Sequence, residues 1–404
     1  MRPLKIGIDV TPASAGMGGV PRYTRCLVEA LLRIDVSNRY ILISLLPEEV
    51  PIPPSSDPSL ASRLRRISCR QALPPRSSVL TRRTPASVKQ WFRPITHAWV
   101  RFWFHYHIKP RLADLDIFHS SELLLWGPRE GKHVVTVCDL TTLLFPKFHT
   151  HGNIQLHARK LTFAKTRAHT VIAISQHTKR DLITQYGIPP ERIRVIYPGC
   201  DPTRYRPLTH AEILPTLSRY HLSPGYLLYV GTIEPRKNLA RLIEACERLA
   251  HRLGRPPAPL VLVGAPGWKT QEIYRRIERS PLRSAIVLTG AVDEQDLPQL
   301  YNGASVFVYP SLYEGFGLPV LEAMACGIPV VTSNVSSLPE VIGDAGLAVN
   351  PEDPEALAGA LHQLLTNESL RDALGQKGQQ RAQQFSWDRT ARETLRTYEE
   401  TARA

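Results

Sequence analysis

The most informative segment of the chain reads Val306-Phe-Val-Tyr-Pro-Ser-Leu-Tyr-Glu-Gly-Phe-Gly-Leu-Pro-Val-Leu-Glu-Ala-Met-Ala-Cys-Gly-Ile-Pro-Val-Val331. Its pattern predicts a strand, a loop, a short helix and a second strand. Pro319 suits the first turn of that helix, where the N–H that proline lacks would have no partner, and Gly327 suits the position just beyond its end. A short helix between two apolar strands predicts one unit of a parallel α/β sheet.

The loop before this helix has the composition of a site for a phosphate or for sugar oxygens. It consists of Gly315, Phe316, Gly317 and Leu318. Backbone N–H groups at a helix N-terminus bind anions, and glycines let a ligand approach the main chain closely. Glu314 precedes the loop and Glu322 lies one turn inside the helix, so both carboxylates can reach one bound ligand. The alternative is that Glu314 is solvated and Glu322 only complements the helix dipole.

A second polar segment, Tyr229-Val-Gly-Thr-Ile-Glu-Pro-Arg-Lys-Asn-Leu239, follows another predicted strand. Arg236 and Lys237 fall where a helix is expected to begin, so the pair can neutralise a diphosphate without a metal ion. The alternative is an exposed basic pair with no ligand, which is common for an isolated Arg-Lys dipeptide. The position of this pair at a strand end in the same predicted domain favours a ligand site.

Strand-like runs alternate with helical patterns along most of the chain, which predicts parallel sheets with crossover helices. In the first half the predicted strands are Lys5–Val10, Tyr40–Leu46, Ile117–His119, Val134–Val137, Val171–Ser175 and Arg194–Tyr197, with helices near Pro21–Arg33 and Gln176–Tyr186. In the second half they are Tyr226–Val230, Leu260–Val263, Ile286–Leu288, Val306–Tyr309, Val330–Thr332 and Leu347–Val349, with a helix at Leu239–Leu253. The proline-rich segment 197–207 between the two series is typical of an interdomain linker.

The predicted fold class is therefore α/β, with two Rossmann-like, doubly wound parallel-sheet domains that face a cleft. We expect an N-terminal domain over residues 1–200 and a C-terminal domain over residues 208–385. The last helix, about Trp387–Ala402 within 387–404, is expected to pack back on the first domain. Segment Pro47–Pro94 is rich in Pro, Ser and Arg, which predicts long inserted loops. In folds of this kind ligands bind at the carboxyl ends of the strands.

The two polar segments together resemble the family 4 retaining glycosyltransferases of the GT-B fold. That family carries a glutamate, seven residues and a second glutamate within E-G-F-G-L-P-x-x-E-A-M-A-x-G-x-P-V, and a basic pattern G-x-x-x-x-R-K-N-L; this chain matches both. The resemblance extends from near residue 4 to the end, with region 47–110 least covered. It implies that Glu314 and the following loop hold the donor sugar and that Glu322 binds the nucleotide ribose. It also implies that Arg236 and Lys237 stabilise the leaving diphosphate, and that Val292 lies near the base.

In the first domain the resemblance points to three loops. Gly18 and Gly19 resemble the family's glycine loop, which faces the donor phosphate and the acceptor across the cleft. Members often carry His-Asp after a strand at which this chain has Cys138 and Asp139, so the imidazole is missing here. Asp139 is expected to position the acceptor hydroxyl, with a turn or helix-cap role as the alternative. His119 and Cys138 are further acceptor-side candidates, and a core histidine is the alternative for His119.

Composition narrows the class of protein. No run in the 404 residues approaches the roughly 18 apolar residues of a membrane-spanning helix. The six cysteines are scattered, without the spacing of a zinc site, which is typical of reduced thiols in a cytoplasmic protein. Asp114-Leu-Asp116 fits the D-x-D of metal-dependent transferases, but three residues match easily by chance, and we interpret both aspartates as loop-to-strand residues. We therefore expect no metal and no cofactor.

The net charge of +14 is concentrated in the first half of the chain. Residues 1–206 hold 31 Lys and Arg against 14 Asp and Glu, an excess of +17, and the remainder carries −3. Such asymmetry suits an anionic membrane surface, nucleic acid or a phosphorylated acceptor. Segment 91–109 adds an aromatic face at helical spacing, which suits an interfacial helix or, as the alternative, a buried core helix. No nucleic-acid recognition module is present, so we expect no nucleic-acid partner.

The expected function is retaining transfer of a hexose, namely mannose from GDP-mannose, to a glycan or lipid-linked acceptor in polysaccharide synthesis. Mannose is chosen by analogy, because segments 138–146 and 311–319 look most like mannosyltransferases that build surface polysaccharides. The alternatives are a UDP-sugar-dependent glycosyltransferase, a nucleotide-sugar epimerase and a non-enzymatic nucleic-acid-binding protein. The expected location is the cytoplasm, with peripheral attachment to the inner membrane face.

Overall fold

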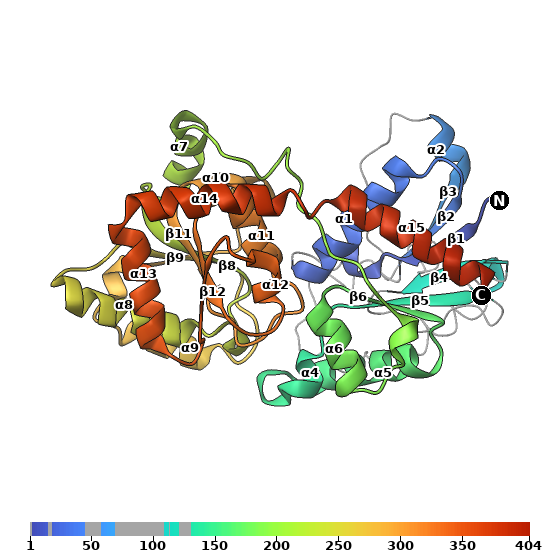
Figure 1. Cartoon of the computed structure of the whole chain (residues 1–404), viewed down its shortest axis with the longest axis horizontal. Helices are drawn as coiled ribbons and strands as arrows, with labels where there is room; N and C mark the ends of the chain where they lie inside the picture. The colour runs from blue at the N-terminus through green and yellow to red at the C-terminus, as the bar shows by residue number, and fades with distance from the viewer. Residues whose placement is uncertain (1, 15–17, 45–57, 69–108, 113, 121–130) are drawn as a thin grey trace, which may run out of the picture.

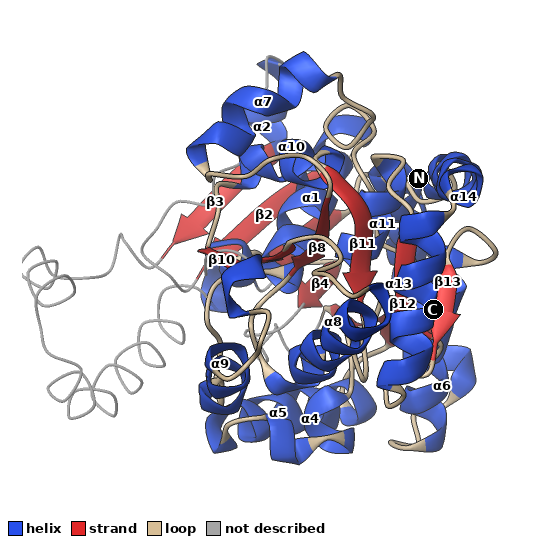
Figure 2. Ribbon diagram, turned by 90° about the vertical axis from the view of Figure 1, so that its left-hand side faces the viewer, coloured by secondary structure: helices blue, strands red, loops and turns tan. Residues whose placement is uncertain are grey.

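The computed structural model describes residues 2–14, 18–44, 58–68, 109–112, 114–120 and 131–404. Its strands form two separate parallel sheets, and Figure 1 shows the corresponding domains side by side. In Figure 2 the strands lie in the interior with helices around them. The predicted fold class, two Rossmann-like parallel-sheet domains, is confirmed.

The first sheet has seven strands in the order β3-β2-β1-β4-β5-β6-β7. They are β1 (Lys5–Asp9), β2 (Arg39–Ser44), β3 (Leu64–Ser68), β4 (Ile117–Ser120), β5 (Lys132–Val137), β6 (Thr170–Ala173) and β7 (Ile193–Val195). The helices described in this domain are α1 (Gly19–Ile34), α2 (Pro58–Arg63), α4 (Thr141–Leu144), α5 (His151–Thr166) and α6 (Gln176–Thr184). The central strands are almost wholly buried, as expected for a parallel sheet that helices cover.

The second sheet has six strands in the order β10-β9-β8-β11-β12-β13. They are β8 (Tyr226–Val230), β9 (Leu260–Val263), β10 (Ile286–Gly290), β11 (Ala304–Tyr309), β12 (Val330–Ser333) and β13 (Leu347–Val349). The helices of this half are α7 (His210–Arg219), α8 (Leu239–Leu253), α9 (Gln271–Glu278), α10 (Leu297–Asn302), α11 (Leu318–Ala325), α12 (Leu338–Ile342), α13 (Pro354–Thr366) and α14 (Glu368–Ala382). The strand order reverses between β8 and β11, which is where doubly wound sheets bind ligands.

The last helix, α15 (Trp387–Arg403), leaves the second domain and lies on the first. It packs against α1 and against strands β4 and β5, as the red helix beside α1 in Figure 1 shows. The Trp387 ring meets Tyr23 of α1 edge to face at 5.9 Å, and Tyr398 is fully buried. The chain therefore crosses between the domains twice, once through the linker near Tyr197 and once before α15.

Two elements lie where the sequence analysis expected loops. The segment predicted as loops from Pro47 to Pro94 contains α2 and the edge strand β3, which pairs in parallel with β2. Two adjacent arginines, Arg65 and Arg66, are exposed on β3 and broke the apolar pattern that would have predicted a strand. An edge strand tolerates them because it has a partner on one side only.

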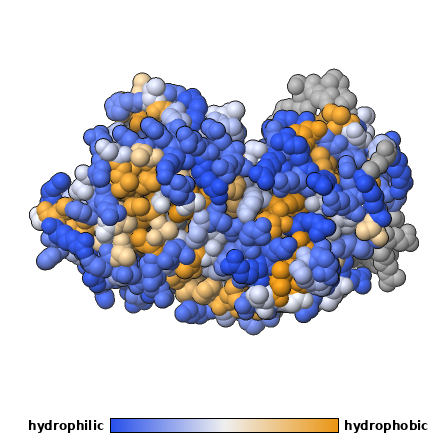
Figure 3. All heavy atoms as spheres, in the orientation of Figure 1, coloured by the Kyte–Doolittle hydropathy of each residue, from blue (hydrophilic) through white to orange (hydrophobic). Residues whose placement is uncertain are grey.

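The carboxyl ends of both sheets face the region between the domains, so the loops that follow β5, β8, β10 and β11 can meet there. Figure 3 shows hydrophilic residues over most of one face, with a notch in its outline between the two lobes. Among the described helices, none combines the length and the apolar character needed to cross a membrane. The aromatic segment 91–109 lies outside the described residues, apart from Lys109 at its end.

Candidate functional site

A buried charge cluster lies where β8 and β11 end, and we call Arg236, Lys237 and Glu314 the cation–glutamate cluster. Glu314 Oε2 lies 2.9 Å from Arg236 Nη1, and Glu314 Oε1 lies 2.6 Å from Lys237 Nζ. Lys237 Nζ also donates to the Tyr309 hydroxyl at 2.6 Å. Each carboxylate oxygen of Glu314 thus has its own cation, which fixes the cluster in one geometry.

The electrostatics of the cluster follow from its burial. Glu314 is 7% exposed and Lys237 is 6% exposed. Burial opposes ionisation of Glu314, but the charges of Arg236 and Lys237 outweigh it and hold the pKa of this carboxyl below its ordinary value. Burial and the neighbouring Arg236 lower the pKa of Lys237. Burial would also lower the pKa of Arg236, but Glu314 and Glu234 raise it well above its ordinary value.

The basic pair lies just before α8, which begins at Leu239 as predicted. Arg236 and Lys237 close a separate 3-10 turn (Pro235–Lys237), and Asn238, with φ 63°, separates that turn from α8. The Asn238 side chain donates to the backbone oxygens of Pro310 and Pro351 at 3.1 and 2.7 Å. This tie holds the basic turn against the end of β11, so the pair belongs to the same loop cluster as Glu314.

The loop from Gly315 to Leu318 leads into α11, which begins at Leu318. Gly317 has φ 113°, a backbone conformation that favours glycine. The Phe316 side chain is 3% exposed and packs with Tyr197 and Phe385, at ring distances of 6.0 and 5.7 Å. Phe316 therefore anchors the loop to both interdomain crossings, and only its backbone is placed to meet a ligand.

The second glutamate, Glu322, is 2% exposed and is paired across the cleft. Its Oε2 accepts from the Tyr301 hydroxyl at 2.9 Å, and its Oε1 contacts the guanidinium of Arg22 on α1 of the other domain. Arg22 Nε also donates to Glu294 at 2.7 Å, and Arg25 holds the same carboxylate through bonds of 2.9 and 3.1 Å. The carboxylate predicted to bind ribose is thus occupied by an arginine of the N-terminal domain.

The two domains also meet at Gly315. A Cβ atom there would lie 1.9 Å from the carbonyl oxygen of Cys138 and 3.0 Å from the Cβ of Asp139. Glycine at this position is therefore required by the close approach of the first domain's backbone. Thr178 donates to the same Cys138 oxygen at 3.3 Å, so this residue contributes its carbonyl to the interdomain contact, while its side chain is buried.

Asp139 is half-buried at this junction, and the charge of Arg236 acts on its carboxylate. Its Oδ1 accepts from the backbone N–H of Thr141 at 2.9 Å, so the turn role considered in the sequence analysis is present. Burial would raise its pKa, but the charge of Arg236 and the bonds to Thr141 lower it below the ordinary value. An ionised carboxylate next to Gly315 can also accept a hydrogen bond from a hydroxyl.

His119, expected on the acceptor side, lies in the core of the first domain. Its Nδ1 lies 2.6 Å from the Tyr398 hydroxyl and its Nε2 lies 2.8 Å from Thr136 Oγ1, and the residue is 2% exposed. Burial lowers its pKa to about 3, so the ring is neutral. Both nitrogens have partners in the core beneath α15, which places His119 in the structural role given as the alternative and not at an acceptor site.

The remaining expected residues lie at the edges of the site. Val292 is 6% exposed and follows β10, two residues before Glu294. Gly18 and Gly19 are exposed at the start of α1, one turn before Arg22, and a Cβ on Gly19 would meet nothing within 4 Å. Asp114 and Asp116 lie before β4, at the opposite end of the sheet, where Lys5 pairs with Asp114 and Arg2 with Asp116.

Several residues at the interdomain contact were missed by the sequence analysis. Glu340 accepts from the first two backbone N–H groups of α6, those of Gln176 and His177, at 3.0 Å each, and from Tyr197 at 3.0 Å. Tyr313 donates to Asp181 of α6 at 2.5 Å. Such contacts join residues far apart in sequence, so only Arg22, which lies three residues after Gly19, carried a local signal.

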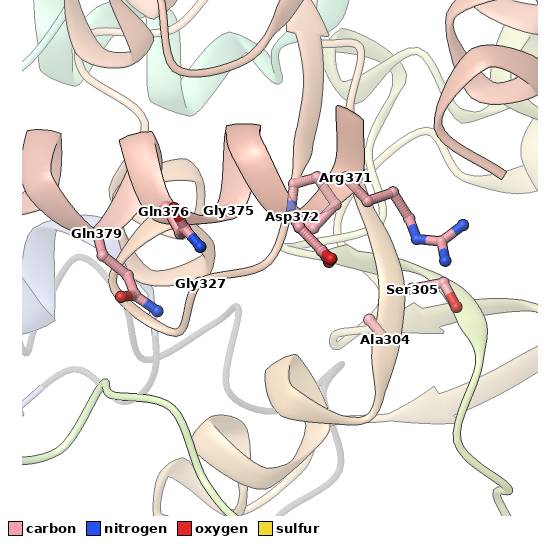
Figure 4. A pocket seen from close by; sticks show the side chains of 9 residues that line it. Ala304, Ser305, Gly327, Arg371, Asp372, Gly375, Gln376 and Gln379 are labelled. Atoms are coloured by element: carbon pink, nitrogen blue, oxygen red, sulfur yellow. The ribbon is translucent and has the colours of Figure 1, made fainter. Parts of the chain in front are cut away.

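Figure 4 shows a separate pocket beside α14, with a volume of about 350 Å³. It is lined by Ala304 at the start of β11, by Pro329 just before β12, and by α14 residues including Arg371. Arg371 Nη1 already donates to the backbone oxygen of Leu364 at 3.0 Å. This pocket lies at the amino ends of the strands, so it is not part of the site between the domains.

Comparison with known proteins agrees with this architecture. The family described as Glycosyltransferase Family 4 matches residues 17–204, and the one described as Glycosyl transferases group 1 matches residues 220–381. O-antigen chain mannosyltransferase B from Escherichia coli is 38% identical over 283 residues, which cover 70% of this chain and 74% of that protein. The chain belongs to the family 4 glycosyltransferases. It is therefore a glycosyltransferase, the leading expectation of the sequence analysis.

Two solved structures share the fold of this glycosyltransferase. Sucrose-phosphate synthase from Thermosynechococcus elongatus superimposes with a TM-score of 0.72 at 22% identity, over 98% of each chain. The Anabaena protein HepE, in complex with UDP and glucose, has a TM-score of 0.69 at 18% identity, over 98% of this chain and 100% of that one. At these identities the likeness concerns the arrangement of the two domains, which extends over the whole chain.

Proposed function

We propose that this glycosyltransferase is a retaining, metal-independent mannosyltransferase. It transfers mannose from GDP-mannose to a glycan or lipid-linked acceptor in polysaccharide synthesis. The observation that carries the proposal is the buried cation–glutamate cluster at the carboxyl ends of β8 and β11, beside the N-terminus of α11. The choice of mannose and of a polysaccharide acceptor is supported by the 38% identity to an O-antigen chain mannosyltransferase.

The cluster is suited to a leaving diphosphate. Arg236 and Lys237 supply two positive charges, held in place and largely shielded from water, where electrostatic interactions are stronger than in solvent. Charge grows on the diphosphate as the glycosidic bond breaks, so cations fixed in advance stabilise the transition state more than the ground state. We place the diphosphate on this pair and on the N–H groups that begin α11, with Glu314 then free to bind sugar hydroxyls. No cofactor takes part in this scheme.

The ribose is placed at Glu322, in exchange for Arg22. A guanidinium and a pair of vicinal hydroxyls both donate hydrogen bonds to a carboxylate, so the arginine occupies the position that the ribose requires. Arg22 keeps Glu294 as a partner after the exchange, because it bonds both carboxylates. Donor binding thereby loosens one ion pair that joins the domains and leaves another intact.

The retaining reaction proceeds on one face of the sugar. The bond between the anomeric carbon and the diphosphate oxygen breaks while the acceptor oxygen forms its bond to the same carbon from the same side. The acceptor proton passes to the departing diphosphate, so no side-chain nucleophile is needed. Asp139, ionised and adjacent to Gly315, orients the acceptor hydroxyl through a hydrogen bond.

A UDP-sugar is the second candidate donor. The observation that favours it is the likeness of the fold to HepE, which has been solved with UDP and glucose. Glu322 does not discriminate between the two donors, because ribose is common to both nucleotides. The residues that follow β10, from Val292 to Glu294, are then expected to choose between guanine and uracil.

We further propose a cytoplasmic location with peripheral attachment to the inner membrane face through the first domain. The +17 excess up to residue 206 supports it, since each Lys or Arg near an anionic leaflet contributes about 1 kcal/mol. Co-flotation with liposomes tests this: binding should require anionic lipid and weaken as salt rises. If the protein stays in solution with anionic vesicles at low salt, the attachment is wrong and a soluble acceptor is indicated.

The function itself is tested by incubating the purified protein with a panel of nucleotide sugars and a polysaccharide-derived acceptor, and measuring the nucleoside diphosphate released. GDP-mannose should give acceptor-dependent release of GDP, with retention of the anomeric configuration shown by NMR of the product. Release from UDP-sugars alone would replace GDP-mannose with the second candidate. An inverted product would contradict the retaining mechanism.

A further inference from the structure

A buried histidine whose Nε2 has no hydrogen-bond partner among the described residues lies where the two domains meet. His149 follows the 3-10 turn Pro146–Phe148 that precedes α5, and it is 9% exposed. Its Nε2 atom is buried and makes no hydrogen bond within the part of the chain that the structure describes. A buried polar atom without a partner costs about 1–3 kcal/mol, and a hydrogen bond from a bound hydroxyl would remove that cost.

The second domain encloses this imidazole. The Trp268 ring lies 5.6 Å from the His149 ring, and Trp268 Nε1 donates to the backbone oxygen of Phe148. Lys269 Nζ donates to the backbone oxygen of Lys147 at 2.5 Å. His149 is thus held between the N-terminal domain, which carries it, and the loop that follows β9, so its burial depends on the contact between the two domains.

The charges around His149 are those of the transfer site. Burial lowers its pKa, and the charged groups that act on it are Asp139, Arg236, Glu234 and His157. The ring is therefore neutral at neutral pH, and a neutral imidazole can bond a hydroxyl without adding charge beside the diphosphate. The side chain of Cys138, which follows β5, has no nitrogen. His149 supplies an imidazole to this site from another segment.

We propose that Nε2 of His149 binds a hydroxyl of the sugar or of the acceptor and positions it beside Asp139 and the cation–glutamate cluster. The proposal rests on the function proposed above. It gives a hydrogen-bond partner to a ring nitrogen that has none among the described residues. It also accounts for an imidazole in a site where the strand β5 is followed by Cys138. The hydroxyl has two possible sources, the donor sugar and the acceptor, and kinetics separate them.

The experiment compares His149→Phe, His149→Gln and His151→Phe with the wild type. Phenylalanine keeps the ring contact with Trp268 and removes the nitrogens, whereas the glutamine amide can reach the place of Nε2. His151 is exposed at the start of α5, so its replacement by phenylalanine is the control. His149→Phe should lower kcat/KM roughly 10- to 100-fold, as expected for one lost hydrogen bond to the substrate, and His149→Gln should recover much of it.

Binding measurements keep this inference separate from the proposed function. GDP, which lacks the sugar, should bind His149→Phe as tightly as it binds the wild type. A rise in KM for GDP-mannose alone assigns the hydroxyl to the donor sugar, and a rise in KM for the acceptor alone assigns it to the acceptor. If the wild type transfers sugar and a folded His149→Phe variant matches it in kcat and both KM values, or if Gln restores nothing, the inference is wrong. If the wild type neither binds nor uses any nucleotide sugar, the proposed function fails instead.

Discussion

Glu314 and Glu322 lie in the same domain with seven residues between them, yet they are neutralised in different ways. Glu314 is paired with Arg236 and Lys237 of its own domain, and Glu322 with Arg22 of the other domain. The part of the site assigned to the diphosphate is therefore assembled within one domain. The part assigned to the ribose changes with the approach of the two domains. Substitutions at the first should act mainly on the chemical rate, and substitutions at the second on donor binding.

The largest effect is expected when the domain-internal cluster loses a cation. Lys237→Met should lower kcat about 100- to 1,000-fold, because one charge that stabilises the departing diphosphate is lost. KM for the donor should change much less. Steady-state kinetics with GDP-mannose measure both, and Lys377→Met, an exposed lysine of α14, is the control. A folded Lys237→Met variant with wild-type kcat would remove the diphosphate from this cluster.

The second prediction concerns the carboxylate that faces the other domain. Glu322→Gln should raise KM for the donor about 10- to 100-fold with a small change in kcat, because hydrogen bonds to a charged group contribute about 1.5–3 kcal/mol each. GDP affinity, measured by calorimetry, should fall by the same factor. Unchanged GDP affinity in a variant with normal thermal stability would show that the ribose binds elsewhere.

The third prediction concerns the arginine on the opposite side of the cleft. Arg22→Gln removes the guanidinium that occupies Glu322, so GDP should bind about 3- to 10-fold more tightly, as a competing ion pair of modest strength no longer has to be displaced. The matched control is Arg25→Gln, which leaves the contact with Glu322 in place. Weaker GDP binding in Arg22→Gln would mean that this arginine is part of the nucleotide site and not its competitor.

The smallest effect is expected at Cys138. Cys138→Ala should leave kcat and both KM values within about twofold, because the residue contributes its backbone oxygen to the interdomain contact. Asp139→Asn, one residue away, should lower kcat/KM for the acceptor about tenfold or more, since the ionised carboxylate is lost. An inactive Cys138→Ala variant with normal stability would reverse this order.

Much of the second domain was predictable from sequence. Strands Tyr226–Val230 and Leu260–Val263 and helix Leu239–Leu253 have the bounds that their apolar patterns predict, because both faces of these strands are buried. The Gly315 loop and the two glutamates were found through their spacing around the predicted helix. What the sequence analysis expected of Gly315 was a ligand against its main chain, and the structure places the backbone of Cys138 there.

The first domain was less predictable, for two physical reasons. Strand β3 was missed because Arg65 and Arg66, exposed at the sheet edge, interrupt its apolar pattern. His119 was assigned to the acceptor side because it ends a strand, and only the packing of α15 reveals that Tyr398 holds it in the core. Arg22 and His149 contact residues of the other domain. Contacts between residues so far apart in sequence leave no local pattern.

In the proposed mechanism, Arg236 and Lys237 take the place of a metal ion at the diphosphate. This role is tested most directly by measuring the rate of mannose transfer from GDP-mannose with EDTA present, for the wild type and for Lys237→Met. The wild type should turn over at an unchanged rate in EDTA, and the loss in Lys237→Met should not be recovered by added manganese. If EDTA abolishes wild-type turnover and manganese restores it, the diphosphate role of Arg236 and Lys237 is contradicted.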